Sequence, residues 1–219
     1  MVIHLRQISI VKRFIVVHVV QLLEAGGRYY NRRIEIMSEE INSSKILYST
    51  GRNDEWKTPA YAVHPVIKYL KKDWVVWCPF DLESESEYVK VLRDAGFKVI
   101  CSHISEGKDF FLWEPKEHWD IIISNPPFTN KREIFKRAIE LGKPFMLLMS
   151  NTWLNDAAPK QIFGEGESSE LELLMFDKRV NFINRETGET CKKGITFSSS
   201  YYCRGVLPRA IICEKLNLE

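Results

Sequence analysis

Residues 119–149 read WDIIISNPPFTNKREIFKRAIELGKPFMLLM, and this stretch decides the fold. The runs 119–124 and 144–149 are short and almost wholly apolar, which is typical of strands buried on both faces of a parallel sheet. Between them, residues 131–141 place Ile, Phe, Ala and Leu on one side of a helix that Gly142 ends. We therefore predict a strand–helix–strand unit with an Asn-Pro-Pro-Phe loop after its first strand.

The same alternation continues towards the N-terminus. Apolar strands are predicted at 74–78 and 97–101, with a helix between them that begins at Ser84 or Ser86 and ends near Asp94. The other predicted elements are a helix from Pro59 to about Lys72, interrupted at His64-Pro65, and strands at 171–176, 180–183, 195–203 and 209–213. We expect an α/β doubly wound fold: a mostly parallel, twisted sheet with helices on both faces. The last two strands are predicted to form a C-terminal antiparallel hairpin at one edge.

The N-terminal part differs in composition from the rest. Residues 1–36 carry a net charge of +4, which leaves −2 for 37–219. One helix is predicted there, from Ile10 to Glu24, and it is apolar nearly all round. We treat 1–44 as an N-terminal extension and 45–219 as the main domain. The extension is either a docked helix or non-native sequence, since Arg32-Arg33 shortly before Met37 can encode a translated ribosome-binding site.

Composition excludes several classes of protein. With 219 residues, 45% hydrophobic and 27% charged, the chain is long and apolar enough to bury a core and is not disordered. No apolar run reaches the length of a membrane span, so we expect no membrane partner. Five cysteines without a CxxC pair predict reduced thiols in a cytoplasmic protein and no metal site. The oligomeric state stays open.

The Asn125–Phe128 loop has the residue types that an amine-modifying site needs. Ligands of doubly wound folds bind beyond the carboxyl ends of the strands, where this loop is predicted to lie. The Asn125 side-chain oxygen and the Pro126 carbonyl can each accept an N–H bond from an exocyclic amine, and the prolines fix both acceptors. Phe128 offers a ring for stacking. The alternative is a rigid turn with Phe128 packed inward.

This loop resembles the catalytic motif of the S-adenosylmethionine-dependent amino-methyltransferases. Three further segments occur in the order expected of that family: Asp54–Pro59, Trp77–Asp81 and Gly107–Phe111. Together they resemble phage-type and restriction–modification adenine-specific DNA methyltransferases, with a Rossmann-like class I methyltransferase fold. The resemblance covers roughly residues 50–215. It implies methyl transfer to the N6 amine of adenine after base flipping, in a bacterial or phage-infected cell.

The resemblance also implies a role for each motif residue. It implies that the catalytic residues are Asn125, Pro126, Pro127 and Phe128. It implies that S-adenosylmethionine is bound by Trp56, Thr58, Pro59, Pro79, Phe80, Asp81, Asp109 and Phe110. Other assignments stay open: Asp81 as the cap of the next helix, Asp109 as a turn residue, and Trp56 as a core anchor.

The chain departs from the family at the cofactor motif. The usual glycine-rich loop after the first strand is absent, and the second strand ends in Cys101-Ser102-His103 without a carboxylate for the ribose hydroxyls. Either Glu83 or Glu85 then supplies the carboxylate for the ribose hydroxyls, or the site binds the cofactor less tightly.

Double-stranded DNA is the expected partner, and RNA is the second choice. Lys131 and Arg132, with Lys136 and Arg137, follow the catalytic loop and are candidates for phosphate contacts, or else an ordinary solvated helix face. Tyr201 or Tyr202 is a candidate for stacking on the base, or part of a plain sheet edge. The alternatives in function are an RNA or protein amino-methyltransferase with the same loop, and a non-catalytic nucleic-acid-binding protein.

Overall fold

The computed structural model divides the chain into two units, residues 1–53 and 54–219. It describes the strands within residues 4–36, then residues 56–184, 188, 190 and 197–217. Two predicted segments of the main domain lie partly outside the described residues: the motif segment Asp54–Pro59 at its first two residues, and the strand predicted at 195–203 at residues 195–196.

The first unit is a small antiparallel sheet. It consists of β1 (His4–Val11), β2 (Phe14–Ala25) and β3 (Arg28–Ile36), in the order β1-β2-β3. The prediction of a helix from Ile10 to Glu24 is therefore wrong. The run is rich in Val and Ile, whose branched Cβ favours strands over helices, and it lacks the apolar stripe that would have stabilised a helix.

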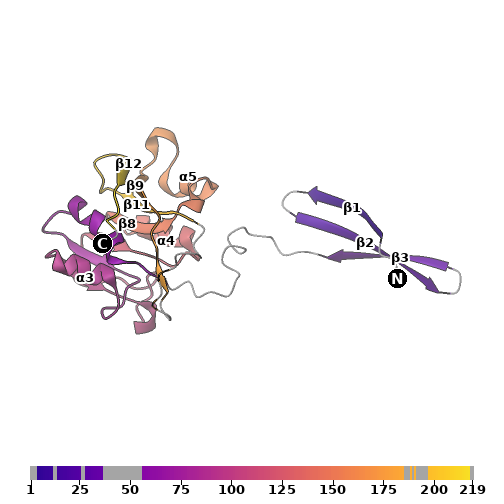
Figure 1. Ribbon diagram of the computed structural model, residues 1–219, viewed down its shortest axis with the longest axis horizontal. Helices are drawn as coiled ribbons and strands as arrows, with labels where there is room; N and C mark the ends of the chain where they lie inside the picture. Colours follow the sequence, from indigo (N-terminus) through magenta and orange to yellow (C-terminus); the bar gives the residue numbers. More distant parts are fainter. Residues whose placement is uncertain are drawn as a thin grey trace. The chain divides into compact units, whose positions relative to one another are not determined.

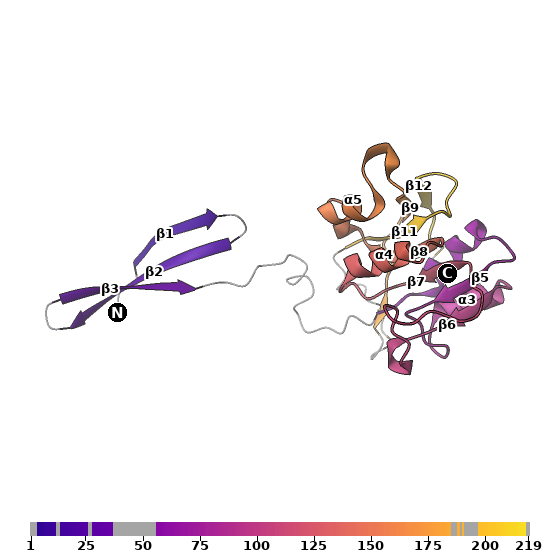
Figure 2. The same cartoon turned by 180° about the vertical axis from the view of Figure 1, so that it is seen from behind.

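The second unit is built on one sheet of seven strands with helices against it (Figures 1 and 2). The strands lie in the order β12-β9-β11-β8-β7-β5-β6. Their bounds are β5 Val75–Cys78, β6 Lys98–Cys101, β7 Ile121–Ser124, β8 Phe145–Ser150, β9 Glu172–Phe176, β11 Ser199–Arg204 and β12 Ile211–Glu214. All seven were expected to within a few residues.

Four parallel strands set the geometry of the site. β5 pairs with β6 on one side and with β7 on the other, and β8 pairs with β7. The chain thus runs outward from β5 to β6 and then returns past β5 to β7, so the direction of winding reverses between β5 and β7. This is a topological switch point, where loops leave in opposite directions and ligands of such sheets bind.

Helices cover both faces of the sheet, as predicted. The helices are α2 (Ala60–Val63), α3 (Glu87–Asp94), α4 (Lys131–Glu140) and α5 (Ala157–Phe163), and a 3₁₀ turn at His64–Tyr69 follows α2. Neighbouring residues of a strand point to opposite faces of the sheet, so two successive residues of β11 contact helices on the two faces. Tyr201 contacts Tyr88 of α3, with ring centroids 6.5 Å apart, whereas Tyr202 lies 5.6 Å from Phe135 of α4.

The C-terminal strands are arranged differently from the prediction. β11 lies inside the sheet, antiparallel to both β8 and β9, and β12 pairs in parallel with β9 at the edge. The expected hairpin is therefore wrong, because β9 separates the two strands. The Glu172 carboxylate of β9 accepts the backbone N–H groups of Gly205, Val206 and Leu207, at 2.7–3.0 Å, and so holds the turn that follows β11.

Two shorter features complete the domain. β4 (Trp56–Lys57) pairs antiparallel with β10 (Ile183–Asn184). The strand expected at 180–183 is thus shorter than predicted and begins at Ile183. The predicted helix from Pro59 breaks at His64, as expected, and its second half is a 3₁₀ turn. None of the described helices is long and apolar enough to cross a membrane.

Candidate functional site

Three strand ends are joined at the switch point by Asp81. Its carboxylate accepts the hydroxyl of Ser124, the last residue of β7, and the hydroxyl of Ser86, each at 2.5 Å. Its backbone N–H donates to Ser102 O, just after β6, at 3.1 Å. Asp81 follows β5, so one residue fixes the spacing of the loops after β5, β6 and β7.

The same contacts decide what caps α3. The Ser86 hydroxyl oxygen accepts the N–H groups of Tyr88 and Val89, so Ser86 is the cap of the helix and Asp81 is not. Asp81 supports the cap indirectly, because its carboxylate accepts the Ser86 hydroxyl and so holds it in the capping position.

An aromatic cluster brings two of the motif segments together. The Phe80 and Phe110 rings lie 4.9 Å apart, and Phe110 lies 5.6 Å from Trp77. Phe110 is buried, so it anchors its loop and offers little surface to a ligand. Asp109 forms a turn, in which one carboxylate oxygen accepts the Phe111 N–H at 2.9 Å. The segments expected to flank a cofactor are therefore adjacent.

Asn125 is held by the segment that contains β4. Its side-chain Nδ2 donates to Trp56 O at 3.4 Å, which leaves Oδ1 turned away from that contact. Asn125 Oδ1 is buried and has no hydrogen-bond partner among the described residues. Most buried polar atoms in native proteins are paired, so an unpaired acceptor at this edge of the sheet marks a candidate ligand contact. Thr58 and Pro59, next in sequence to β4, are both buried.

Phe128 packs inward in this structure. Its side chain is 6% exposed and meets the rings of Phe197 and Phe182 edge-on, at 5.3 and 6.2 Å. A base can stack on Phe128 only after these neighbours move. The two phenylalanines bring the segment before β11 and the segment before β10 against the Asn125–Phe128 loop.

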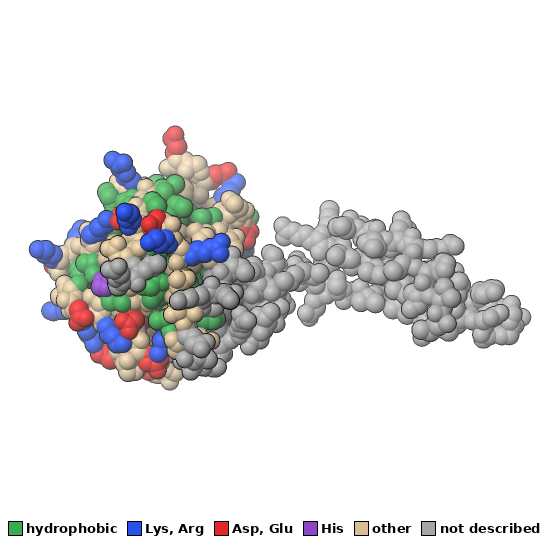
Figure 3. Space-filling model, viewed as in Figure 1, with side chains coloured by type: hydrophobic (Ala, Val, Ile, Leu, Met, Phe, Trp, Pro, Cys, Tyr) green, Lys and Arg blue, Asp and Glu red, His purple; other side chains and the backbone are tan. Residues whose placement is uncertain are grey.

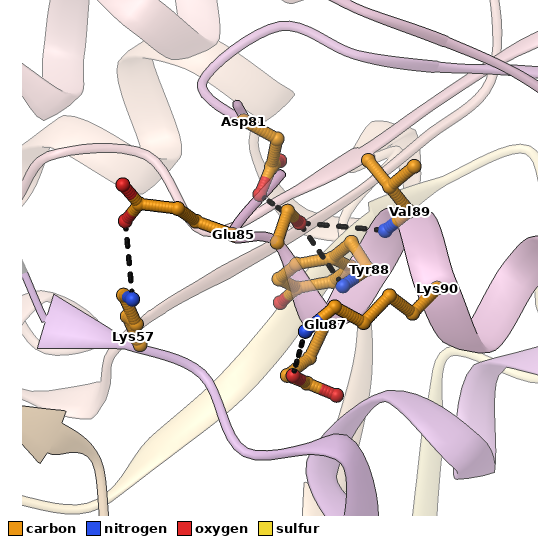
Figure 4. A network of polar contacts seen from close by, with 8 residues as sticks. Lys57, Asp81, Glu85, Glu87, Tyr88, Val89 and Lys90 are labelled. Carbon is orange, nitrogen blue, oxygen red and sulfur yellow. Dashed lines mark hydrogen bonds and ion pairs between the residues drawn. The ribbon is translucent and has the colours of Figure 1, made fainter. Parts of the chain in front are cut away.

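The two glutamates named as ribose ligands lie in different places. Glu83 accepts a contact from Cys101 Sγ, 3.0 Å away at the end of β6, and pairs with Arg93. These contacts, with Arg93 first, lower the pKa of Glu83 to about 2, so the group is ionised at neutral pH. Glu85 instead pairs with Lys57 at 3.1 Å, on the β4 side of the site (Figure 4).

The expected substrate residues divide into two groups. Arg132 is exposed at the start of α4, and Lys131 is half-buried with its ammonium 5.8 Å from the Trp153 ring centroid. Burial lowers the pKa of Lys131. Tyr201 and Tyr202 are fully buried, which leaves neither ring open to a base. Both are therefore removed from the candidate site, and since β11 is internal they are not a sheet edge either.

Two polar residues at the site were missed by sequence reasoning. Asn151 directly follows β8, and Ser199 is the first residue of β11, opposite Ser150. Asn151 Oδ1 and Ser199 Oγ are buried without a hydrogen-bond partner among the described residues. The rule that singled out Asn125, a polar residue at the carboxyl end of a buried strand, would have found Asn151 as well.

Neither a search for metal-binding clusters nor the comparisons with known proteins identify the chain. Within the described part of the chain no three His, Cys, Asp or Glu side chains gather to hold a metal ion. No family model matches the chain, and no curated protein matches it.

Proposed function

We propose that residues 54–219 form an S-adenosylmethionine-dependent methyltransferase that acts on the N6 amine of adenine in DNA. The observation that carries the proposal is the Asn125 amide. Its nitrogen is committed to Trp56 O, whereas its oxygen is buried and unpaired at the switch point. An acceptor fixed in this way suits a substrate N–H, since it is oriented before the substrate arrives.

The residues at the carboxyl ends of β5 and β6 fit the adenosine part of the cofactor. Glu83, ionised and placed at the end of β6, supplies the carboxylate that ribose hydroxyls require in sheets of this kind. Of the two glutamates, Glu83 is therefore the substitute that we favour. Phe111, which is 39% exposed next to Asp109, offers an apolar surface for a base. Pro79, Phe80 and Asp81 lie between this region and Asn125.

The loop supports methyl transfer by orienting the amine. S-adenosylmethionine would supply an electrophilic methyl group: the amine lone pair would form the N–C bond as the methyl–sulfur bond breaks, S-adenosylhomocysteine would leave as the thioether, and the amine would then release a proton to solvent. The lone pair of an exocyclic amine is delocalised into the ring. Two acceptors, Asn125 Oδ1 and the Pro126 carbonyl, can draw its N–H bonds out of the ring plane and so free the lone pair. Neither group has to act as a strong base.

The charge around the site suits a local phosphate contact more than a broad DNA-binding surface. Acidic and basic side chains both occur across the face that Figure 3 shows. Lys131 and Arg132 begin the helix directly after the catalytic loop, where they can meet phosphates that flank a flipped base. We infer that affinity comes from a small footprint and depends moderately on salt.

The decisive test measures label transfer from S-adenosylmethionine to unmethylated double-stranded DNA, with transfer RNA and protein in parallel. We expect N6-methyladenine in DNA from the wild type. Asn125→Ala should lower kcat at least 100-fold, about 3 kcal/mol of barrier, and leave cofactor affinity unchanged by calorimetry. Asn155→Ala, at an exposed asparagine, is the matched control.

Each alternative has its own outcome in this assay. Label in RNA or protein alone would replace the substrate and keep the reaction. Retention of activity in Asn125→Ala within a few-fold would refute the catalytic assignment. A wild type that neither transfers label nor binds the cofactor would refute the proposal and favour a non-catalytic binding protein.

A further inference from the structure

We infer that Asn151 and Ser199 form a recognition subsite for the polar edge of the target base, beside the loop that holds its amine. The inference rests on the proposed function and adds to it two residues and a specificity. It starts from the unpaired oxygens of these two side chains. A buried polar atom without a partner destabilises the fold, so an unpaired group at a strand end is a candidate ligand contact, and its position relative to Asn125 decides whether it belongs to this site.

The topology places these oxygens at the same edge of the sheet as Asn125. β7 and β8 are parallel neighbours, so Asn125 and Asn151 follow the same ends of adjacent strands. β11 runs antiparallel to β8, so its first residue, Ser199, lies at that edge too and pairs with Ser150.

Two contacts join the three segments into one site. The Asn151 backbone N–H donates to Ser198 O at 2.8 Å, which ties the residue after β8 to the start of β11. Phe197, two residues before Ser199, packs against Phe128 with ring centroids 5.3 Å apart. The segment 197–199 therefore bridges the Asn125–Phe128 loop and Asn151.

The chemistry of the set fits adenine. Asn125 Oδ1 can only accept, which suits the N6 amine, and the Ser199 hydroxyl can donate to the neighbouring ring nitrogen N1. Adenine presents this donor next to this acceptor, as cytosine does with its N4 amine and N3, whereas guanine and thymine present an acceptor oxygen next to a protonated ring nitrogen on the same edge. The Asn151 amide supplies a further polar contact to the ring. A site with these groups rejects a base that leaves them unpaired.

The two adjacent serines of β11 provide a matched pair for the test. Ser199 is 4% exposed and Ser200 is 1% exposed, and neither hydroxyl has a partner among the described residues. Successive residues of a strand face opposite sides, so Ser199 lies on the side of Tyr201 and α3, and Ser200 on the side of Tyr202 and α4. Removal of either hydroxyl costs no internal hydrogen bond, and both alanine variants should fold.

The experiment compares Ser199→Ala, Asn151→Ala and the control Ser200→Ala in the full chain. For Ser199→Ala and Asn151→Ala we expect a melting temperature within about 2 °C of that of the wild type. Their KM for unmethylated DNA should rise about tenfold, and their KM for S-adenosylmethionine should not change. Ser200→Ala should match the wild type in all three. A parallel fluorescence titration should show a loss of affinity of similar size in the first two variants for a duplex that contains adenine, and no loss for a duplex that lacks it.

Two results separate this inference from the proposed function. A wild type without methyl transfer refutes the proposed function, and the titration then still decides whether Asn151 and Ser199 bind the base. Unchanged KM and affinity in both variants would overturn the subsite, as would an equal loss in Ser200→Ala.

Discussion

Removal of the Asp81 carboxylate should loosen the whole carboxyl edge of the sheet. In Asp81→Ala two hydroxyl-to-carboxylate hydrogen bonds are lost, to Ser86 and Ser124. Bonds to a charged group contribute about 1.5–3 kcal/mol each, and Asp81 is partly exposed, so the lower value applies. The free energy of unfolding should fall by about 3 kcal/mol, or about 6–12 °C in melting temperature for a domain of this size.

A double-mutant cycle isolates the Asp81–Ser124 contact. Ser124→Ala should cost about 1.5 kcal/mol by itself and almost nothing once Asp81 is alanine, which gives a coupling near 1.5 kcal/mol. Urea unfolding followed by the fluorescence of buried tryptophans, among them Trp77, measures all four proteins. Ser84→Ala, exposed in the same loop, is the control. Additive losses, or a loss below 1 kcal/mol in Asp81→Ala, would refute the view that Asp81 joins the strand ends.

Two further predictions concern stability. Tyr201→Phe should cost about 2 kcal/mol, because it removes two buried hydrogen bonds, one to the Ala62 carbonyl and one with the Tyr88 hydroxyl. Calorimetry measures this cost, and a value no larger than that of Tyr202→Phe, which breaks one bond, would contradict the prediction. Glu83, with its pKa lowered from 4.5 to about 2, stabilises the fold above about pH 4.5, and this contribution is lost as pH falls towards 2. The side chain is 58% exposed, so the effect should be 1 kcal/mol or less, and Glu83→Gln should flatten the acid limb of stability against pH; an unchanged acid limb would show that the pair contributes nothing.

The parallel half of the sheet could be predicted from the sequence, because its strands and helices are marked by short apolar runs and by capping residues. The runs before Cys78 and Ser124 are apolar throughout, and the helix between β5 and β6 begins at a serine cap, one of the two expected. The sequence also located the Asn125–Phe128 loop at a strand end. These features depend on residues within a few positions of one another.

The remaining features depend on pairing between distant residues. β9 reaches β12 and β11 through contacts that no local pattern encodes, and the role of Glu172 becomes visible only once Gly205–Leu207 is beside it. Likewise, the burial of Tyr201 and Tyr202 follows from the position of β11 inside the sheet. The N-terminal strands were missed because an all-apolar run fits either a helix or a strand, and its branched side chains were given too little weight.

The interior position of β11 constrains how the protein is made. On the ribosome, β8 and β9 emerge before residues 199–204, and until then each has an open edge that β11 will later fill. An unpaired edge of apolar strands is a template for pairing with another chain. We expect the nascent domain to stay incomplete until β11 leaves the exit tunnel, so that synthesis rate and chaperone access govern its yield.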